Sequence, residues 1–194
     1  MIKEQKRRKI RDAAAKIFAE RGFENTTTRD IAKFAEISPA SVYYYFDSKE
    51  VLLYQILDET MSTGLALIEE IEQSDKNLKE KLSDILRIHT RAAVDYNKMK
   101  LLVHDQNSLS SEHKEIIKQK QRTYVKKLIE ILEDLKQKGE ILNLDTTVCA
   151  FTFFGMVSWA YRWYNPKGRI TPDELSEIFN QIFTGGIYSN HRKP

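Results

Sequence analysis

Apolar residues recur along most of the chain at the three- and four-residue spacing of an α-helix. The first stripe ends before Gly22, a residue type that commonly closes helices, and consists of Ile10, Ala13, Ala14, Ile17 and Phe18. Longer stripes occupy residues 51–73, 78–96 and 111–138, whereas no strand-like alternation extends beyond about four residues. The pattern therefore predicts an all-α protein of about nine helices.

Residues 26–49 contain two shorter helical segments joined by a tight turn. Thr27 can cap the first segment, because Asp30 is placed to bond back to the cap amide. Ser38 can cap the second, and Pro39 then takes the first helical position, where a missing amide costs nothing. The apolar sides of the two segments would pack on each other and on the preceding helix. This arrangement predicts a three-helix helix-turn-helix domain.

The second segment carries three successive tyrosines, Tyr43, Tyr44 and Tyr45. Each ring left in water would expose about 150 Å² or more, so we expect a polar partner to cover them. DNA meets this need, because a helix enters the major groove, small residues at its start lie against base edges and tyrosine hydroxyls reach phosphates. We interpret residues 38–46 as a DNA-recognition helix. The alternative is a helical hairpin whose tyrosines are half-buried in a larger bundle.

Positive charge is concentrated in the same part of the chain. The formal net charge is only +3, yet residues 1–56 hold 11 Lys or Arg against 8 Asp or Glu, and the remainder balances at 20 against 20. Residues 1–11 alone carry six basic residues and one acidic residue. This placement favours contact with phosphates, and the alternative is a solvated chain end without a binding role.

Five short motifs follow one another in this region: Gly22-Phe23, Thr26-Thr27, Asp30-Ile31-Ala32, Tyr43-x-Tyr45-Phe46 and Ser48-Lys49-Glu50. Together they resemble the N-terminal domain of the tetracycline-repressor (TetR) family of bacterial transcription regulators. The resemblance implies a DNA-binding domain over residues 1–50 and a helical domain for ligand binding and dimerisation over residues 51–194. One departure is Glu36, which stands where the family usually has a glycine in the turn. A positive φ there would cost on the order of 1 kcal/mol.

The resemblance also implies which residues contact an operator. Bases would be faced by Arg29, Pro39, Ala40, Ser41 and Tyr43. Phosphates would be faced by Thr27, Tyr44, Tyr45 and Lys49. Thr28 and Ser38 complete the predicted DNA-binding set. Lys49 also stands at the start of a helix, where backbone amides can hold a phosphate.

Residues 146–164 form a segment that is hydrophobic almost all round and must therefore be covered on every side. A second copy of the chain is the expected cover, together with the helix opened by Thr171-Pro172-Asp173-Glu174. This predicts a homodimer with a four-helix interface, and TetR-like regulators do dimerise through their last two long helices. The expected interface residues are Phe151, Phe154, Trp159, Trp163, Phe179, Ile182 and Phe183. The alternative is a core helix inside a monomer.

A small hydrophobic effector would bind in the helical domain that follows the DNA-binding domain. The candidate ligand-binding residues are His89, Tyr96, Tyr124, Phe153 and Arg162, although each alone is more often structural. The run Trp159-x-Tyr161-Arg162-Trp163-Tyr164-x-Pro166-x-Gly168 is similar to TetR-like repressors of fatty-acid and steroid breakdown, which respond to acyl-coenzyme A. The expected function is a repressor of lipid-metabolism genes that such a ligand releases from a palindromic operator. The alternative is a regulator of a drug-efflux pump that responds to hydrophobic compounds.

Other classes of protein have less support. Cys149 is the single cysteine and the four histidines lack ligand spacing, so we expect neither a disulfide nor a metal site. No nucleotide-binding or hydrolase motif occurs, which argues against an enzyme and against a cofactor. No apolar stretch is long enough to span a membrane, and a cytoplasmic location is expected. Another alternative is a helical interaction protein whose residues 1–22 bind acidic lipid or another protein. That alternative does not explain the three successive tyrosines of residues 38–46.

Overall fold

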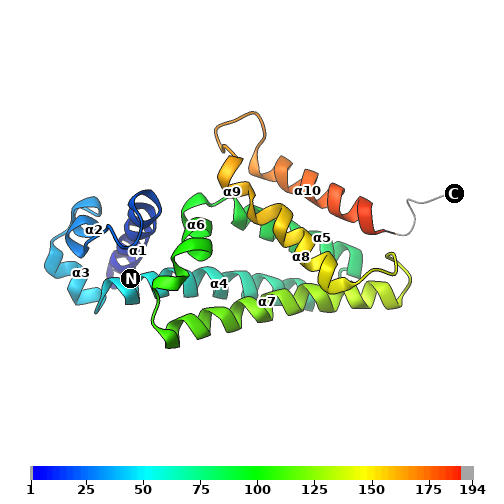
Figure 1. The fold of residues 1–194 in the computed structure, drawn as a ribbon, viewed down its shortest axis with the longest axis horizontal. Helices are drawn as coiled ribbons and strands as arrows, with labels where there is room; N and C mark the ends of the chain where they lie inside the picture. Colours follow the sequence, from blue (N-terminus) through cyan, green and yellow to red (C-terminus); the bar gives the residue numbers. More distant parts are fainter. Residues whose placement is uncertain (1, 189–194) are drawn as a thin grey trace. The chain divides into compact units, whose positions relative to one another are not determined.

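The computed structural model describes residues 2–188, and within this range the chain forms helices, turns and one isolated β-bridge (Figure 1). The all-α fold expected from the sequence is confirmed. The helices are α1 (Ile2–Arg21), α2 (Thr28–Phe34), α3 (Pro39–Tyr45), α4 (Lys49–Gln73), α5 (Leu78–Ala93), α6 (Tyr96–His104), the 3₁₀ helix η1 (Asp105–Ser108), α7 (Ser111–Gln137), α8 (Thr146–Ser158), α9 (Ala160–Trp163) and α10 (Pro172–Ile187).

The chain divides into two compact units that interleave in sequence. The first extends from the N-terminus to Ser62 and also includes Tyr96–Gln119. The second comprises Thr63–Asp95 and the chain from Lys120 onward. The DNA-binding domain expected over residues 1–50 lies within the first unit, which additionally contains part of α4, α6, η1 and the start of α7.

The first unit is built around the apolar side of α1. Ile10, Ile17 and Phe18 are fully buried there, and the Phe18 ring packs on Phe23 with centroids 5.2 Å apart. Both α2 and α6 pack against α1, and the Lys100 ammonium of α6 donates a hydrogen bond of 2.5 Å to the Ala19 carbonyl. These contacts give α2 and α3 a fixed support.

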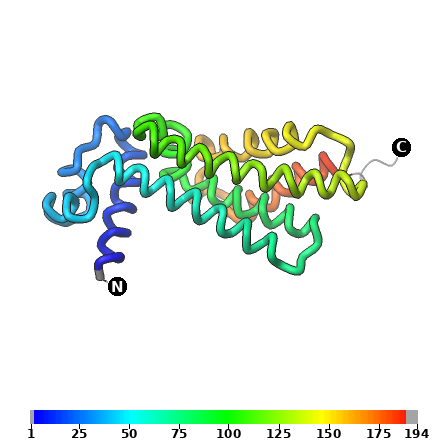
Figure 2. Tube along the Cα trace, turned by 90° about the horizontal axis from the view of Figure 1, so that it is seen from below, coloured from blue at the N-terminus to red at the C-terminus, as the bar shows by residue number. Residues whose placement is uncertain are grey.

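The second unit joins α5 and α10 side by side, as Figures 1 and 2 both show. Two ion pairs cross this contact, Arg87 with Glu177 at 2.8 Å and Arg91 with Asp173 at 2.9 Å. The apolar side of α7 and the inner side of α8 complete the core with fully buried Leu128, Leu132, Leu135, Phe153 and Val157.

Most helix ends fall where the sequence places them. Gly22 and Gly139 both have positive φ and close α1 and α7, and Thr171 caps α10 through a capping box with Glu174. One expectation is wrong, because the helix expected over residues 146–164 is interrupted at Trp159. After the break the Arg162 amide bonds back only three residues, to the Trp159 carbonyl, so the chain continues as the separate single-turn helix α9.

Candidate DNA-binding site

The start of α2 is fixed by a capping box, as the sequence predicts. The Thr27 hydroxyl accepts from the Asp30 amide at 3.1 Å, and the Asp30 carboxylate accepts from the Thr27 amide at 2.9 Å. Hydrogen bonds from the Thr27 side chain and backbone lower the pKa of Asp30. Because this box holds the Thr27 hydroxyl, the adjacent exposed Arg29 projects from a rigid first turn.

The turn between α2 and α3 contains the strained residue that the missing glycine predicts. Glu36 has a φ of 55°, in the left-handed region that glycine favours. Its amide bonds to the Lys33 carbonyl at 3.2 Å and the Ile37 amide to the Ala32 carbonyl at 3.0 Å, the two bonds of a Schellman motif. The family turn is therefore retained with a non-glycine residue.

The helix α3 has one buried side and one bare side. Ser38 caps it by accepting from the Ser41 amide at 3.2 Å, and Pro39 takes the first helical position. Val42 and the following Phe46 are buried, as are the α2 residues Ile31, Ala32 and Ala35. The predicted contacts at the start of α3 remain uncovered, with Ser38, Pro39 and Ala40 exposed and Ser41 half-buried.

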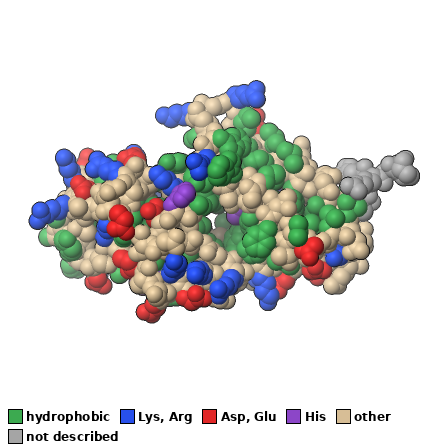
Figure 3. All heavy atoms as spheres, in the orientation of Figure 1, with side chains coloured by type: hydrophobic (Ala, Val, Ile, Leu, Met, Phe, Trp, Pro, Cys, Tyr) green, Lys and Arg blue, Asp and Glu red, His purple; other side chains and the backbone are tan. Residues whose placement is uncertain are grey.

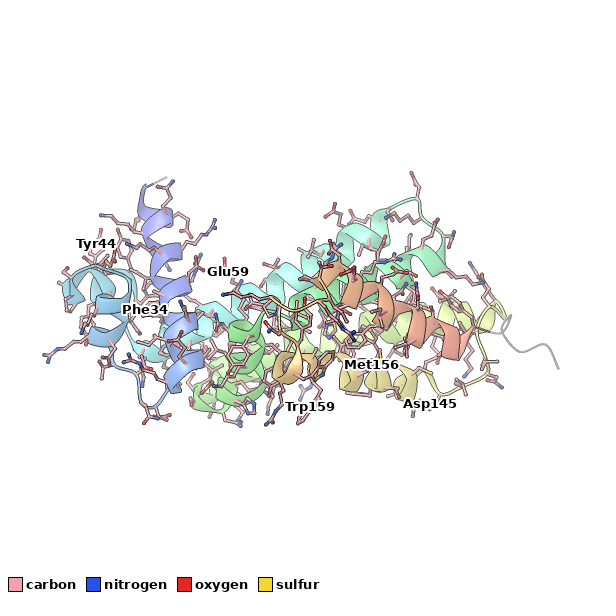
Figure 4. All side chains as sticks on the ribbon, turned by 90° about the horizontal axis from the view of Figure 1, so that it is seen from above. Phe34, Tyr44, Glu59, Asp145, Met156 and Trp159 are labelled. Atoms are coloured by element: carbon pink, nitrogen blue, oxygen red, sulfur yellow. The ribbon has the colours of Figure 1, made fainter. Side chains whose placement is uncertain are left out.

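Two of the three tyrosines project from the molecule. Tyr43 is 56% exposed and Tyr44 is 72% exposed, and Figure 4 places Tyr44 on the outer side of this unit. The Tyr43 hydroxyl lies 2.6 Å from the Thr28 hydroxyl, which holds the ring in one position. Tyr45 is half-buried, with its ring perpendicular to that of Tyr44 at 5.0 Å. The alternative of half-buried tyrosines therefore applies to Tyr45 alone.

Lys49 has a structural contact that the sequence does not indicate. Its ammonium donates to the Phe23 carbonyl at 2.7 Å and lies 4.1 Å from the centroid of the Phe23 ring. The Phe23 amide in turn donates to the Asp105 carboxylate, whose pKa is raised by burial although this hydrogen bond opposes the shift. The peptide unit that leads into the helix-turn-helix is thus held from both sides.

The start of α7 holds the first turn of α4. The Glu50 carboxylate accepts from the Ser110 amide at 2.8 Å and lies 2.9 Å from Nδ1 of His113. The His113 ring stacks on Tyr54 with centroids 3.9 Å apart. Sequence reasoning missed this cluster, because partners about sixty positions apart leave no local signal.

The basic residues of α1 are used in two ways. Arg7 donates to Gln55 at 2.9 Å and lies over the Phe46 ring, and Arg11 pairs with Glu59 at 3.0 Å, so both connect α1 to neighbouring helices. Lys3 lies 5.7 Å from the centroid of the exposed Tyr44 ring, next to the bare side of α3. The basic residues near the N-terminus thus belong to the continuous helix α1.

An aromatic cluster occupies the centre of the second unit. The His89 ring of α5 lies 5.5 Å from Tyr124 of α7, 5.5 Å from Phe153 and 4.9 Å from Phe154 of α8. Nδ1 of His89 is 3.2 Å from the Tyr124 hydroxyl. Gly64 of α4 makes room, since a Cβ there would lie 3.0 Å from the Tyr124 ring. Three of the five candidate ligand-binding residues thus meet.

The other two candidates lie elsewhere. Arg162 is exposed on α9 and packs its guanidinium over the Trp159 ring at 4.5 Å. Tyr96 begins α6, in the first unit, where its ring is 47% exposed and lies near the Lys100 ammonium.

An apolar surface runs along α8, α9 and α10, where hydrophobic side chains gather in Figure 3. Four predicted interface residues are more than half exposed: Phe151, Trp159, Trp163 and Ile182. Figure 4 shows Trp159 at the outer side of this unit. Sequence reasoning missed the exposed Val148 and Ile178. Two predictions need correction, because helix phase turns Phe179 and Phe183 into the unit's own core. Phe154 is half-buried beside the His89 ring, and its place in the interface stays a prediction.

Two family models match this chain. One, described as "Bacterial regulatory proteins, tetR family", matches residues 10–56. The other, described as "Tetracyclin repressor-like, C-terminal domain", matches residues 75–187, more than half of the chain. The chain belongs to the tetR family. The protein is therefore a bacterial transcription regulator and not an enzyme.

Relatives of this tetR-family chain are similar along nearly its whole length. The transcriptional repressor KstR2 of Rhodococcus jostii is 29% identical over 198 residues, which cover 97% of this chain and 94% of the relative. The fatty acid metabolism regulator protein of Bacillus subtilis is 29% identical over 190 residues, covering 96% and 98%. The crystal structure of AibR in complex with isovaleryl coenzyme A and operator DNA matches with a TM-score of 0.80 at 27% identity, covering 91% and 97%.

Two further properties concern residues 2–188 only. Among their helices, none is both long and apolar enough to cross a membrane. Nor do these residues bring together three or more His, Cys, Asp or Glu side chains in a way that could hold a metal ion.

Proposed function

We propose that this tetR-family protein is a homodimeric repressor that leaves a palindromic operator when an acyl-coenzyme A thioester binds its second unit. The observation that carries the proposal is the bare side of α3, with Tyr43 and Tyr44 more than half exposed above a buried apolar side. The similarity to AibR, solved with isovaleryl coenzyme A and operator DNA, supports both the DNA and the class of effector.

In this proposal α3 enters the major groove by its N-terminal end. Its first residues are small, so the helix can approach base edges and thymine methyl groups closely. The residues proposed to face bases are Arg29, Pro39, Ala40, Ser41 and Tyr43, with Thr28 holding Tyr43 in place. The residues proposed to face phosphates are Thr27, Tyr44, Tyr45 and Lys49, and Ser38 docks with the start of α3 in the groove. Lys49 contributes its charge from its position on Phe23.

Dimerisation is proposed to occur through the exposed apolar surface of α8, α9 and α10. Phe151 and Ile182 are each 59% exposed, and Trp159 and Trp163 are similarly bare. A contiguous surface of this kind is costly in water and typical of a protein interface. A two-fold axis through it would present two α3 helices to the two halves of a palindrome.

The effector is proposed to insert its acyl chain among the aromatic residues around His89. Phe153 and Phe154 supply an apolar lining there, and the exposed guanidinium of Arg162 is suited to bind phosphates of the coenzyme A moiety. A ligand that binds better to a conformation unable to hold both operator halves shifts the population away from DNA.

The test is selection of genomic DNA fragments by the purified protein at about 0.15 M salt, repeated with a panel of acyl-coenzyme A thioesters. We expect enrichment of a short palindrome that a thioester abolishes. A palindrome that is indifferent to thioesters but released by hydrophobic drugs would favour a regulator of drug efflux. Failure to enrich any sequence would contradict the assignment of α3 as a reading helix for this DNA.

A further inference from the structure

The His89 ring contains a buried polar atom without a partner, in the aromatic cluster of the second unit. Its Nδ1 is 3.2 Å from the Tyr124 hydroxyl, whereas its Nε2 is buried and has no hydrogen-bond partner among the described residues. Buried polar atoms are almost always paired, because an unpaired one forfeits its hydrogen bonds to water. An apolar side chain would fill this position at less cost, so the imidazole calls for an explanation other than packing.

The geometry decides what kind of group Nε2 presents. If the Tyr124 hydroxyl donates to Nδ1, the neutral ring carries its proton on Nε2 and only that N–H is unpaired. The opposite tautomer would leave both the tyrosine hydrogen and the Nε2 lone pair without partners. The first arrangement is the less costly, so His89 presents an N–H donor.

The surroundings decide what charge the partner can have. The rings next to His89 belong to Tyr124, Phe153 and Phe154. Burial is the cause that lowers the pKa of His89 to about 4 and that raises the pKa of Tyr124, with no charged side chain contributing. A carboxylate placed here would have no cation to offset its lost hydration, whereas an uncharged carbonyl needs only one donor.

We propose that Nε2 of His89 donates a hydrogen bond to the carbonyl oxygen of an acyl thioester, and that the site therefore rejects the free carboxylate of the same acyl chain. The proposal rests on the effector-binding role proposed above for the second unit. Phe154 is half-buried, and its ring lies 4.9 Å from the imidazole at an interplanar angle of 74°. The proposal requires this side chain to rotate so that the acyl carbonyl reaches Nε2.

The test compares three ligands that share one acyl chain length: octanoyl-coenzyme A, its thioether S-octyl-coenzyme A, which lacks the carbonyl, and octanoate. Their dissociation constants are measured by calorimetry on the full-length protein without DNA. The wild type should bind the thioester about tenfold more tightly than the thioether, the value of one ordinary hydrogen bond, and octanoate more weakly than either.

His89→Phe retains the ring and should bind thioester and thioether equally, while Cys149→Ala, a buried change elsewhere in α8, should keep the tenfold preference. Equal binding of the two ligands by the wild type, or a preference that survives in His89→Phe, would overturn the proposal. So would tight binding of octanoate, or failure of every ligand to bind.

Operator release, measured in parallel with the same ligands, separates this proposal from the proposed function. Release by thioester and thioether at equal concentrations would leave a coenzyme A-responsive repressor without a carbonyl-reading His89. Binding with the expected preference but without release would keep the role of His89 and contradict the proposed effector response.

Discussion

Glu36 adopts a backbone conformation that favours glycine, and the surrounding turn holds it there. Its φ of 55° is one that L-residues avoid, because Cβ approaches the following carbonyl. The Schellman bonds around it hold the turn that sets the angle between α2 and α3. The strain is therefore a local cost of holding α3 at its angle to α2.

Glu36→Gly should raise the free energy of unfolding by about 1 kcal/mol, because glycine adopts positive φ without the Cβ clash. Urea unfolding followed by circular dichroism measures the change. Gly139→Ala is the matched control at a second positive-φ site, with open space around its Cβ, and should destabilise by a similar amount. No gain from glycine would mean that the turn is not strained.

His89 makes a second prediction at the scale of single residues. Its pKa is about 4 in the folded protein against 6.5 when unfolded, so the unfolded chain binds more protons between these values. Stability is then complete above pH 6.5 and lost as the pH falls, by about 2 kcal/mol at pH 5. Urea unfolding at pH 7 and pH 5 should show this loss in the wild type and a correspondingly smaller loss in His89→Phe. Equal losses in the two proteins would contradict a buried, uncharged imidazole.

At the scale of elements, the caps were predictable and the cross-helix contacts were not. Thr27, Ser38 and Thr171 cap their helices as expected, because a cap depends on residues only three positions away. The helix break at Trp159 does not occur at a glycine or a proline. The apolar pattern of residues 146–164 therefore predicts one continuous helix. The attachment of Lys49 to Phe23 depends on how α4 meets α1, which spacing along the chain does not specify.

Lys49 is bonded to the Phe23 carbonyl and is also proposed to face a phosphate, and these two roles can be separated by experiment. Lys49→Met should weaken binding to all DNA sequences by a similar factor and reduce the dependence of log K on log salt by about one unit, because one phosphate neutralisation is lost. Binding to the palindrome and to an unrelated duplex is measured between about 0.1 and about 0.3 M salt. A loss confined to the palindrome would instead indicate that Lys49 acts by positioning Phe23 and the helix-turn-helix.

At the scale of the whole molecule, the family identifies the protein as a transcription regulator, and the exposed apolar surface of α8, α9 and α10 is the proposed contact between two copies. The sequence pattern predicted an apolar interface on the last helices but included residues that the unit buries itself. Phe179 and Phe183 point inward whereas Ile178 and Ile182 point outward, a helix phase that requires the packing on α5 to be known.

Ile182→Glu should convert the proposed dimer to a monomer, because a charge in the centre of an apolar interface loses its hydration without a partner. The folded monomer should persist, since Ile182 is 59% exposed within its own unit. Sedimentation velocity measures the change, and Leu67→Glu, at an exposed apolar position on α4, is the control that should remain dimeric. A dimeric Ile182→Glu variant would place the interface elsewhere.

The central claim is that the bare side of α3 reads DNA, and its most direct test is a fluorescence anisotropy titration of the selected palindrome with wild type and Tyr43→Ala. Tyr43 is 56% exposed, so the variant should fold normally, as circular dichroism would verify. Loss of its contact should weaken operator binding by about 1–3 kcal/mol while binding to unrelated DNA changes little. A folded Tyr43→Ala protein with unchanged operator affinity would contradict the account.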